Sequence, residues 1–197
     1  MLEETDPAEG SVPAMRVVVI GTSGAGKSTF AAALHGAAQI PHIELDALYW
    51  GPGWTAVPHH QFESAVLAAT DMHAWVADGN YSAVRDVLWA RATHIVWLNY
   101  PAAAIARRLL WRTLRRGLLR TPLWQGNRES LRMAFFSRDS ILLWAYSTFG
   151  KNRRRYSALR RDLRYAHLDW QEITHPSQAV RWIESHRRPP KSPDRTA

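Results

Sequence analysis

The stretch of sequence that decides the fold is Gly21-Thr22-Ser23-Gly24-Ala25-Gly26-Lys27-Ser28-Thr29. It matches the pattern Gly-x-x-x-x-Gly-Lys-Ser/Thr at every fixed position. A β-branched run, Val17 to Ile20, precedes it, and an alanine-rich segment, Phe30 to Leu34, follows it. A strand, a glycine loop and a helix in this order are the context in which the pattern forms a phosphate-binding P-loop. We therefore predict a P-loop at residues 21–29.

The residue types of this loop suit a bound polyphosphate. Backbone N–H groups of a tight glycine loop converge on an anion, and the following helix N-terminus adds donors and a positive dipole end. Glycine permits the positive φ and close backbone approach that this needs. We expect Lys27 to reach the terminal phosphates of ATP and Ser28 to bind Mg²⁺. The expected nucleotide-binding residues are Gly21, Ser23, Gly24, Ala25, Gly26, Lys27, Ser28 and Thr29.

Length and composition limit the class of protein. The chain has 197 residues, enough for one domain with a buried core. It has no cysteine, which excludes disulfides, thiolate metal sites and a cysteine nucleophile. No apolar run reaches the roughly 18 residues of a membrane span, and the acidic start, Met1-Leu2-Glu3-Glu4, is unlike a signal peptide. We expect a cytoplasmic protein with no membrane partner.

The charge is strongly basic, with a formal net charge of +8, and arginine supplies most of it. Ten tryptophans are also unusual for this length. Arginine beside tryptophan can indicate base stacking on nucleic acid. It can equally indicate arginine clamps around phosphate groups. Composition alone leaves both interpretations open.

Apolar runs alternate with helical patterns between two irregular tails, which we expect to be disordered at residues 1–14 and 187–197. The expected strands are 16–20, 42–45, 75–77, 94–98 and 165–170. The expected helices are 28–38, 58–70, 82–91 with Ser82 as N-cap, 101–116, 128–164 with a break near Gly150, and 177–186. This order predicts one α/β domain, residues 15–186, with a three-layer α/β/α P-loop fold and a five-stranded parallel sheet. Ligands of such folds bind at the carboxyl ends of the strands.

Two aspartates come at expected strand ends, Asp46 after the second strand and Asp78 after the third. One can hold a water of the Mg²⁺ shell while the other orients or deprotonates an acceptor hydroxyl. We assign Asp78 to the metal and Asp46 to the acceptor, and strand alternation would put Glu44 on the same face as Asp46. The alternative for each aspartate is a helix N-cap or a turn.

Two further groups of residues are expected near the acceptor. Trp50 and Trp54 lie in a loop of aromatics and turn formers, where they either stack on a ring of the ligand or cap the core. Arg108 and Arg112 share a helical face by their spacing. A second arginine-rich segment, which includes Arg154, follows a short loop, so we expect a helical lid at about 112–155 that closes on phosphate. The alternative is a solvated basic face.

These motifs resemble the nucleoside monophosphate kinase superfamily. The nearest resemblance is to the adenylate-kinase-like proteins labelled "DNA topology modulation protein". The residues that carry it are Gly21–Thr29, Leu45-Asp46-Ala47-Leu48-Tyr49-Trp50, Asp78-Gly79-Asn80-Tyr81, Leu98-Asn99-Tyr100-Pro101, Arg108 with Arg112, and Trp124–Glu129.

The resemblance implies an ATP-binding kinase fold with a small lid, in which Arg108 and Arg112 match the paired lid arginines of adenylate kinases. The chain departs from adenylate kinases after Asp78-Gly79, because Asn80-Tyr81-Ser82 replaces an aromatic residue, a proline and the arginine that holds the acceptor phosphate. Arg85 is the nearest substitute. This departure argues against AMP as the acceptor.

The function we expect is an ATP·Mg²⁺-dependent phosphotransferase that acts on a small acceptor, with Lys27, Asp46, Arg108 and Arg112 as catalytic residues. Two alternatives remain: a nucleotide-dependent nucleic-acid-binding or regulatory ATPase, and an NTP hydrolase without an acceptor. The expected metal-binding residues are Ser28 and Asp78. The expected substrate-binding residues are Asp46, Trp50, Trp54, Asp78, Tyr81, Arg85, Arg128 and Arg154.

Overall fold

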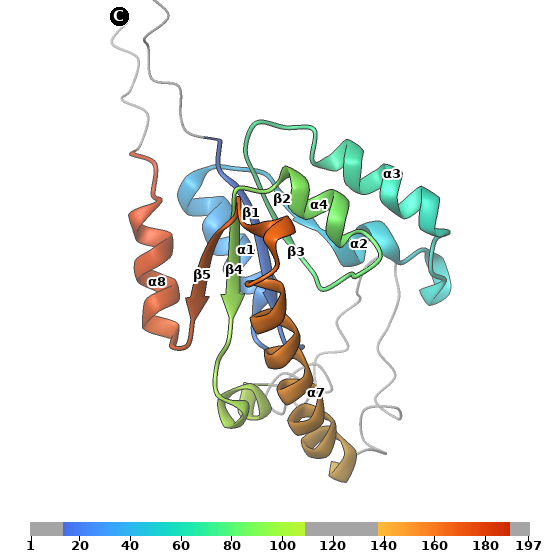
Figure 1. The fold of residues 1–197 in the computed structure, drawn as a ribbon, viewed down its shortest axis with the longest axis vertical. Helices are drawn as coiled ribbons and strands as arrows, with labels where there is room; N and C mark the ends of the chain where they lie inside the picture. The colour runs from blue at the N-terminus through green and yellow to red at the C-terminus, as the bar shows by residue number, and fades with distance from the viewer. Residues whose placement is uncertain (1–13, 109–137, 190–197) are drawn as a thin grey trace, which may run out of the picture.

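The structure, a computed structural model, describes residues 14–108 and 138–189 (Figure 1). The tails expected at 1–14 and 187–197 lie almost wholly outside these ranges, as does the first part of the expected lid. At the C-terminal limit, the Arg188 N–H donates to the Ala37 carbonyl at 3.0 Å. No helix in the two described ranges is long and apolar enough to cross a bilayer.

A five-stranded sheet forms the centre of the molecule, with the strand order β2-β3-β1-β4-β5 and every neighbouring pair parallel. This confirms the predicted parallel sheet. β1 is the central strand, and its residues 17–20 are at most 2% exposed because helices cover both faces. The strands are β1 Arg16–Gly21, β2 His42–Glu44, β3 Trp75–Asp78, β4 His94–Leu98 and β5 Asp169–Ile173.

Helices cover both faces of the sheet and complete the predicted three layers (Figure 1). Alternate residues of β1 point to opposite faces, so Val17 and Val19 pack in one cluster and Val18 and Ile20 in the other. The first cluster includes α1 (Lys27–Ala38) and α8 (Pro176–Ser185). The second includes α3 (His59–Ala69), α4 (Arg85–Arg91) and α7 (Arg138–Leu159).

The second expected strand is shorter than predicted. β2 ends at Glu44, and Leu45 begins the short helix α2 (Leu45–Tyr49). Asp46 therefore lies in the first turn of a helix, where an acidic side chain is favoured by the helix dipole. The prediction that strand alternation puts Glu44 and Asp46 on the same face was wrong, because Asp46 lies in a helix and not in the strand. A 3₁₀ turn, η1 (Pro52–Trp54), follows α2.

The last expected strand was also misplaced. Residues Leu163–Tyr165 form a 3₁₀ turn, η3, and β5 begins only at Asp169. Tyr165 and Leu168, which precede β5, are buried and pack the turn after α7 onto the core, with the Tyr165 ring 4.7 Å from that of Trp89. Backbone pairing of β5 with β4 starts at His94 and Asp169, and this pairing sets the start of the strand.

Three helix predictions also need correction or restriction. α4 begins at Arg85 without a side-chain cap, because residues 82–84 form a turn that buries Val84, so Ser82 is not an N-cap. α7 continues through Gly150 without a break, since one helical glycine costs only about 1 kcal/mol. The helix expected at 101–116 is described only over residues 102–108, which are helical.

Candidate active site

The P-loop occupies the carboxyl end of the central strand. Gly21, Gly24 and Gly26 have φ angles of 154°, 83° and 91°, which confirms the predicted need for glycine. A Cβ added to Gly21 would lie 2.8 Å from the Leu98 carbonyl oxygen, so a larger residue cannot take this position without a shift of the backbone. Gly26 is the N-cap of α1, and no side chain caps that helix end. The loop and helix end can therefore bind an anion.

The end of β3 is bonded to this loop through Asn80. The Gly21 N–H donates to Asn80 Oδ1 at 3.4 Å, and Asn80 Nδ2 donates to the Gly21 carbonyl at 2.5 Å. Lys27 Nζ donates to the same carbonyl at 3.2 Å, so the lysine side chain lies across the loop. Thr22 accepts a longer bond, 3.5 Å, from Asn152 of α7.

Asp78 and Ser28, the predicted metal pair, are in contact. Ser28 Oγ donates to Asp78 Oδ2 at 2.6 Å, and His42 Nε2 lies 2.9 Å from Asp78 Oδ1. An ionised carboxylate only accepts hydrogen bonds, so His42 donates. Asp78 is 6% exposed, and these two donors offset the cost of burying it. A hydroxyl beside a carboxylate provides the oxygen ligands that Mg²⁺ prefers.

One cavity of about 950 Å³ runs along the carboxyl edge of the sheet and includes the P-loop, Ser28 and Asp78. β2 and β4 lie on opposite sides of β1 in the sheet. We therefore call the two ends of the cavity the β2 end and the β4 end. The β2 end is lined by Glu44, Asp46, Trp50 and Trp54. The β4 end is lined by Tyr100, Arg108, Pro176, Ala179, Val180 and Ile183.

Asp46 is held in the β2 end by Tyr81, whose hydroxyl donates to Asp46 Oδ1 at 2.5 Å. Burial and this hydrogen bond raise the pKa of Tyr81, so the hydroxyl keeps its proton at neutral pH. The Tyr81 ring packs 4.7 Å from Tyr49 and 5.0 Å from Phe62. Asp46 is therefore attached to the core through an aromatic cluster.

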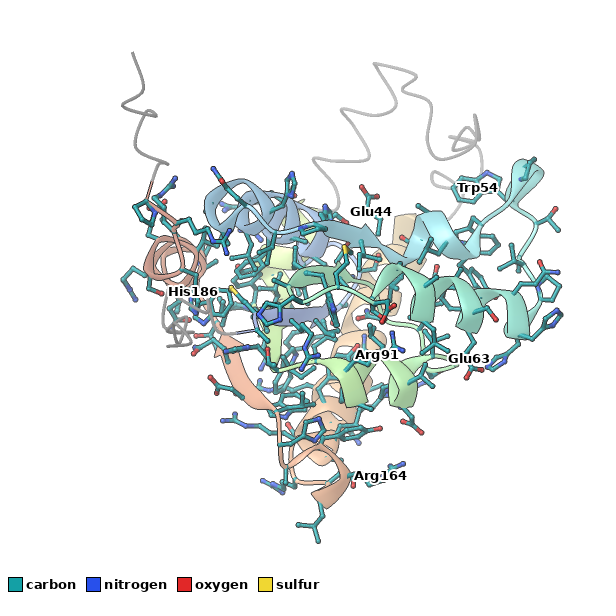
Figure 2. The ribbon with its side chains drawn as sticks, turned by 90° about the horizontal axis from the view of Figure 1, so that it is seen from above. Glu44, Trp54, Glu63, Arg91, Arg164 and His186 are labelled. Carbon is teal, nitrogen blue, oxygen red and sulfur yellow. The ribbon has the colours of Figure 1, made fainter. Side chains whose placement is uncertain are left out.

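Trp50 and Trp54 line the cavity, and neither belongs to the hydrophobic core. Their rings are 5.8 Å apart and nearly perpendicular, at 78°. Figure 2 shows Trp54 and Glu44 along the same edge of the molecule. The geometry thus favours ligand contact over core capping for the two tryptophans.

Among the predicted arginines that the structure describes, Arg108 contacts the P-loop. Its Nη1 donates to the Ala25 carbonyl at 3.2 Å, and its guanidinium lies 4.7 Å from the centre of the Tyr100 ring. Arg112 and Arg128 lie outside the described residues. Arg154 is exposed on α7 and does not line the cavity.

Arg85 also lies away from the large cavity. It begins α4, its guanidinium is 5.7 Å from the centre of the Trp89 ring, and it lines a separate void of about 10 Å³. Burial and the charge of Arg155 lower its pKa. Of the other predicted substrate residues, Tyr81 lines the same small void. Asp46, Trp50, Trp54 and Asp78 line the large cavity, and Arg85 does not.

Comparison with solved structures identifies the architecture. A shikimate kinase from Acinetobacter baumannii, solved in complex with shikimate, matches with a TM-score of 0.52 and 15% identity over 88% of this chain and 91% of that one. A gluconokinase from Sinorhizobium meliloti 1021 matches at 0.51 and 19% identity over 88% and 91%. A shikimate kinase from Bacteroides thetaiotaomicron matches at 0.51 and 15% identity over 87% and 95%. The fold is that of the P-loop kinases.

At these identities the likeness extends to the P-loop kinase fold alone. Neither a protein-family model nor a curated protein sequence matches the chain. The narrower resemblance to the "DNA topology modulation protein" group therefore stays a prediction.

Within this P-loop kinase fold, sequence patterns did not single out His42 or Asn80 as site residues. His42 is 36 residues from Asp78, and they meet because β2 and β3 are neighbours. Asn80 follows the Asp-Gly pair, and its bonds to Gly21 span 59 residues. The Asp-Gly-Asn-Tyr run was the available signal for Asn80, whereas His42 had none.

Proposed function

We propose that the protein is a P-loop small-molecule kinase that transfers the γ-phosphoryl group of ATP to a small acceptor. The observation that carries the proposal is the single cavity that joins the P-loop to Asp46, with the Ser28–Asp78 pair beside the loop. Solved structures with this fold include a gluconokinase and two shikimate kinases, which favours phosphoryl transfer over a purely structural use of the loop.

The residues of the cavity fit ATP and Mg²⁺. The glycine loop and the uncapped start of α1 can hold the phosphates, and Lys27, which donates to the Gly21 carbonyl, lies on the same loop. Ser28 and Asp78 would hold the metal, directly or through its water. No group of three or more His, Asp or Glu side chains suited to a metal occurs in the described ranges. Binding of Mg²⁺ would therefore depend on the phosphates as well.

When bound, ATP·Mg²⁺ supplies the phosphoryl group and the metal charge. Asp46 accepts the proton that the acceptor hydroxyl loses as its oxygen forms a bond to phosphorus, while the bond from phosphorus to the leaving ADP oxygen breaks. Tyr81 holds the Asp46 carboxylate in place for this step. Lys27 and Arg108 would stabilise negative charge on the transferring group.

The test is ADP formation in the presence of a panel of small alcohols, nucleosides and nucleotides. Lys27→Ala should abolish tight nucleotide binding and transfer, since the lysine is the point charge on the phosphates. Lys151→Ala is the matched control, because Lys151 is exposed on α7 and does not line the cavity. Unchanged nucleotide affinity in Lys27→Ala contradicts the site. Absence of any stimulating acceptor, together with DNA binding that falls steeply with salt, favours the nucleic-acid alternative instead.

A further inference from the structure

Asp78 is the buried carboxylate of the candidate metal pair, and each of its two oxygens has its own donor. Ser28 Oγ, in the first turn of α1, donates to Oδ2 at 2.6 Å, and His42 Nε2, on β2, donates to Oδ1 at 2.9 Å. A carboxylate with one fixed donor on each oxygen cannot rotate without breaking a hydrogen bond. The direction of Asp78 is therefore set by His42 as well as by Ser28.

The sheet brings His42 to Asp78 although 36 residues separate them. β2 and β3 are parallel, and their register pairs His42 with Val76, two residues before Asp78. The imidazole therefore extends along the sheet, toward its carboxyl edge, to reach Oδ1. The side chains of His42 and Asp78 are only 13% and 7% exposed, so water competes little for this hydrogen bond.

His42 acts on the candidate site through Asp78. It is not among the described residues that line the large cavity, whereas Ser28 and Asp78 both line it. The His42 bond takes up Oδ1 and leaves Oδ2 beside the Ser28 hydroxyl, which gives two neighbouring oxygens of the kind that Mg²⁺ prefers. Hydrogen-bond partners that orient the ligands of a metal typically contribute about 10- to 100-fold to its affinity.

We propose that His42 is a positioning residue for Mg²⁺ binding: it holds Asp78 Oδ1 so that Oδ2 stays beside the Ser28 hydroxyl. The proposal rests on the proposed function, in which Ser28 and Asp78 are the metal-binding residues. A histidine that only satisfies a buried carboxylate would stabilise the fold in the same way, but its replacement would not change Mg²⁺ affinity. Metal affinity therefore separates the two roles.

The test compares two amide variants, His42→Gln and His42→Asn. Both keep N–H donors at residue 42, but the asparagine side chain is one methylene shorter and should stop short of Asp78. Calorimetry gives the Kd of ADP in EDTA and in MgCl₂, and their ratio is the Mg²⁺ gain. We expect His42→Asn to bind ADP in EDTA like the wild type and to lose about tenfold or more of the Mg²⁺ gain, and His42→Gln to keep most of it. A wild-type Mg²⁺ gain in His42→Asn, or an equal loss in both variants, overturns the inference.

His94→Asn is the matched control. His94 Nε2 also faces a carboxylate, that of Asp169 at 3.8 Å, but this pair lies where β4 and β5 begin, away from the P-loop. Its Mg²⁺ gain should equal that of the wild type. If ADP binding by the wild type itself does not depend on Mg²⁺, the metal pair of the proposed function fails and the role of His42 fails with it. A gain that the wild type shows and His42→Asn retains removes the role of His42 alone.

A measurement on the wild type does not depend on how the variants fold. The imidazole ¹⁵N spectrum of the nucleotide-free protein, assigned through the backbone, should show a proton on His42 Nε2, since this nitrogen donates to Asp78. ADP with MgCl₂ should shift this signal further than ADP in EDTA, and the His94 signals should not move. A proton on Nδ1 alone, or equal shifts in the two conditions, contradicts the positioning role.

Discussion

Two carboxylates in the cavity are held by hydrogen-bond donors from other parts of the chain. Asp78 accepts from Ser28 and from His42, and Asp46 accepts from Tyr81. Such bonds fix the direction of a carboxylate, and geometry within a fraction of an ångström decides how well it can serve in phosphoryl transfer. The hydroxyl of Tyr81 is thus a positioning group for Asp46.

Tyr81→Phe should leave nucleotide affinity unchanged and lower kcat on the order of 10- to 100-fold, because Asp46 loses its fixed orientation. The loss of one hydrogen bond should also cost about 0.5–1.5 kcal/mol of stability. Steady-state kinetics and urea unfolding measure the two effects. Tyr165→Phe is the control, since its hydroxyl is bonded to Asp86 and not to a residue of the cavity. Equal kcat values for both variants would contradict the role of Tyr81.

At the scale of elements, the connections after β2 and β3 pack together at a glycine. Gly79 has φ 148°, and a Cβ there would lie 2.8 Å from Leu45 Cβ, in the first turn of α2. Its N–H donates to the Val19 carbonyl at 3.5 Å, which joins the turn to the central strand. The position of α2, and with it that of Asp46, therefore depends on the absence of a side chain at residue 79.

We expect Gly79→Ala to lower the free energy of unfolding by about 1–3 kcal/mol, since the backbone is in a region that alanine rarely adopts and the new methyl group would displace Leu45. Because Leu45 precedes Asp46, kcat should fall as well. Chemical denaturation and kinetics give both values. Gly36→Ala is the matched control: nothing lies within 4 Å of its added Cβ in α1, so it should stabilise by about 0.5–1 kcal/mol. Wild-type stability in Gly79→Ala would rule out the packing constraint.

At the scale of the whole molecule, the C-terminal end of α8 packs near the amino end of β4, away from the P-loop. His94, Trp182 and His186 form the contact, with the His94 ring 6.4 Å from Trp182 and 6.3 Å from His186. Burial lowers the pKa of His94 below 6.5, and it outweighs the opposite effect of Asp169. As the pH falls below about 6.5, His94 therefore takes up a proton more readily in the unfolded chain than in the folded protein.

The contribution of His94 should accordingly make the protein less stable as the pH falls below about 6.5, and this loss should be absent above that pH. His94→Gln cannot titrate, so its Tm should depend less on pH between about pH 5 and 7. Thermal unfolding of both proteins across this range measures the difference. Parallel Tm–pH curves would show that another group causes the pH dependence.

The P-loop, the parallel sheet and the layering could be predicted because each depends on neighbouring residues. A glycine loop between an apolar strand and a helix is complete within residues 17–34, and alternation of strands with helices implies crossover connections. Element ends were less predictable. Asp46 and Tyr165 were both expected at the end of a strand and lie outside it. The end of β2 depends on where its backbone pairing with β3 stops, and the start of β5 depends on where its pairing with β4 begins.

The sequence by itself determined a phosphate-binding loop, an α/β P-loop fold and the residue types of the site, since local patterns of glycine and apolar residues encode them. Only the tertiary structure decided which side chains meet. His42 joins Asp78 across two strands, Tyr81 joins Asp46 across 35 residues, and Arg85 packs on Trp89 instead of entering the cavity. These contacts follow from strand order and helix starts, which are set by packing between segments far apart in the chain.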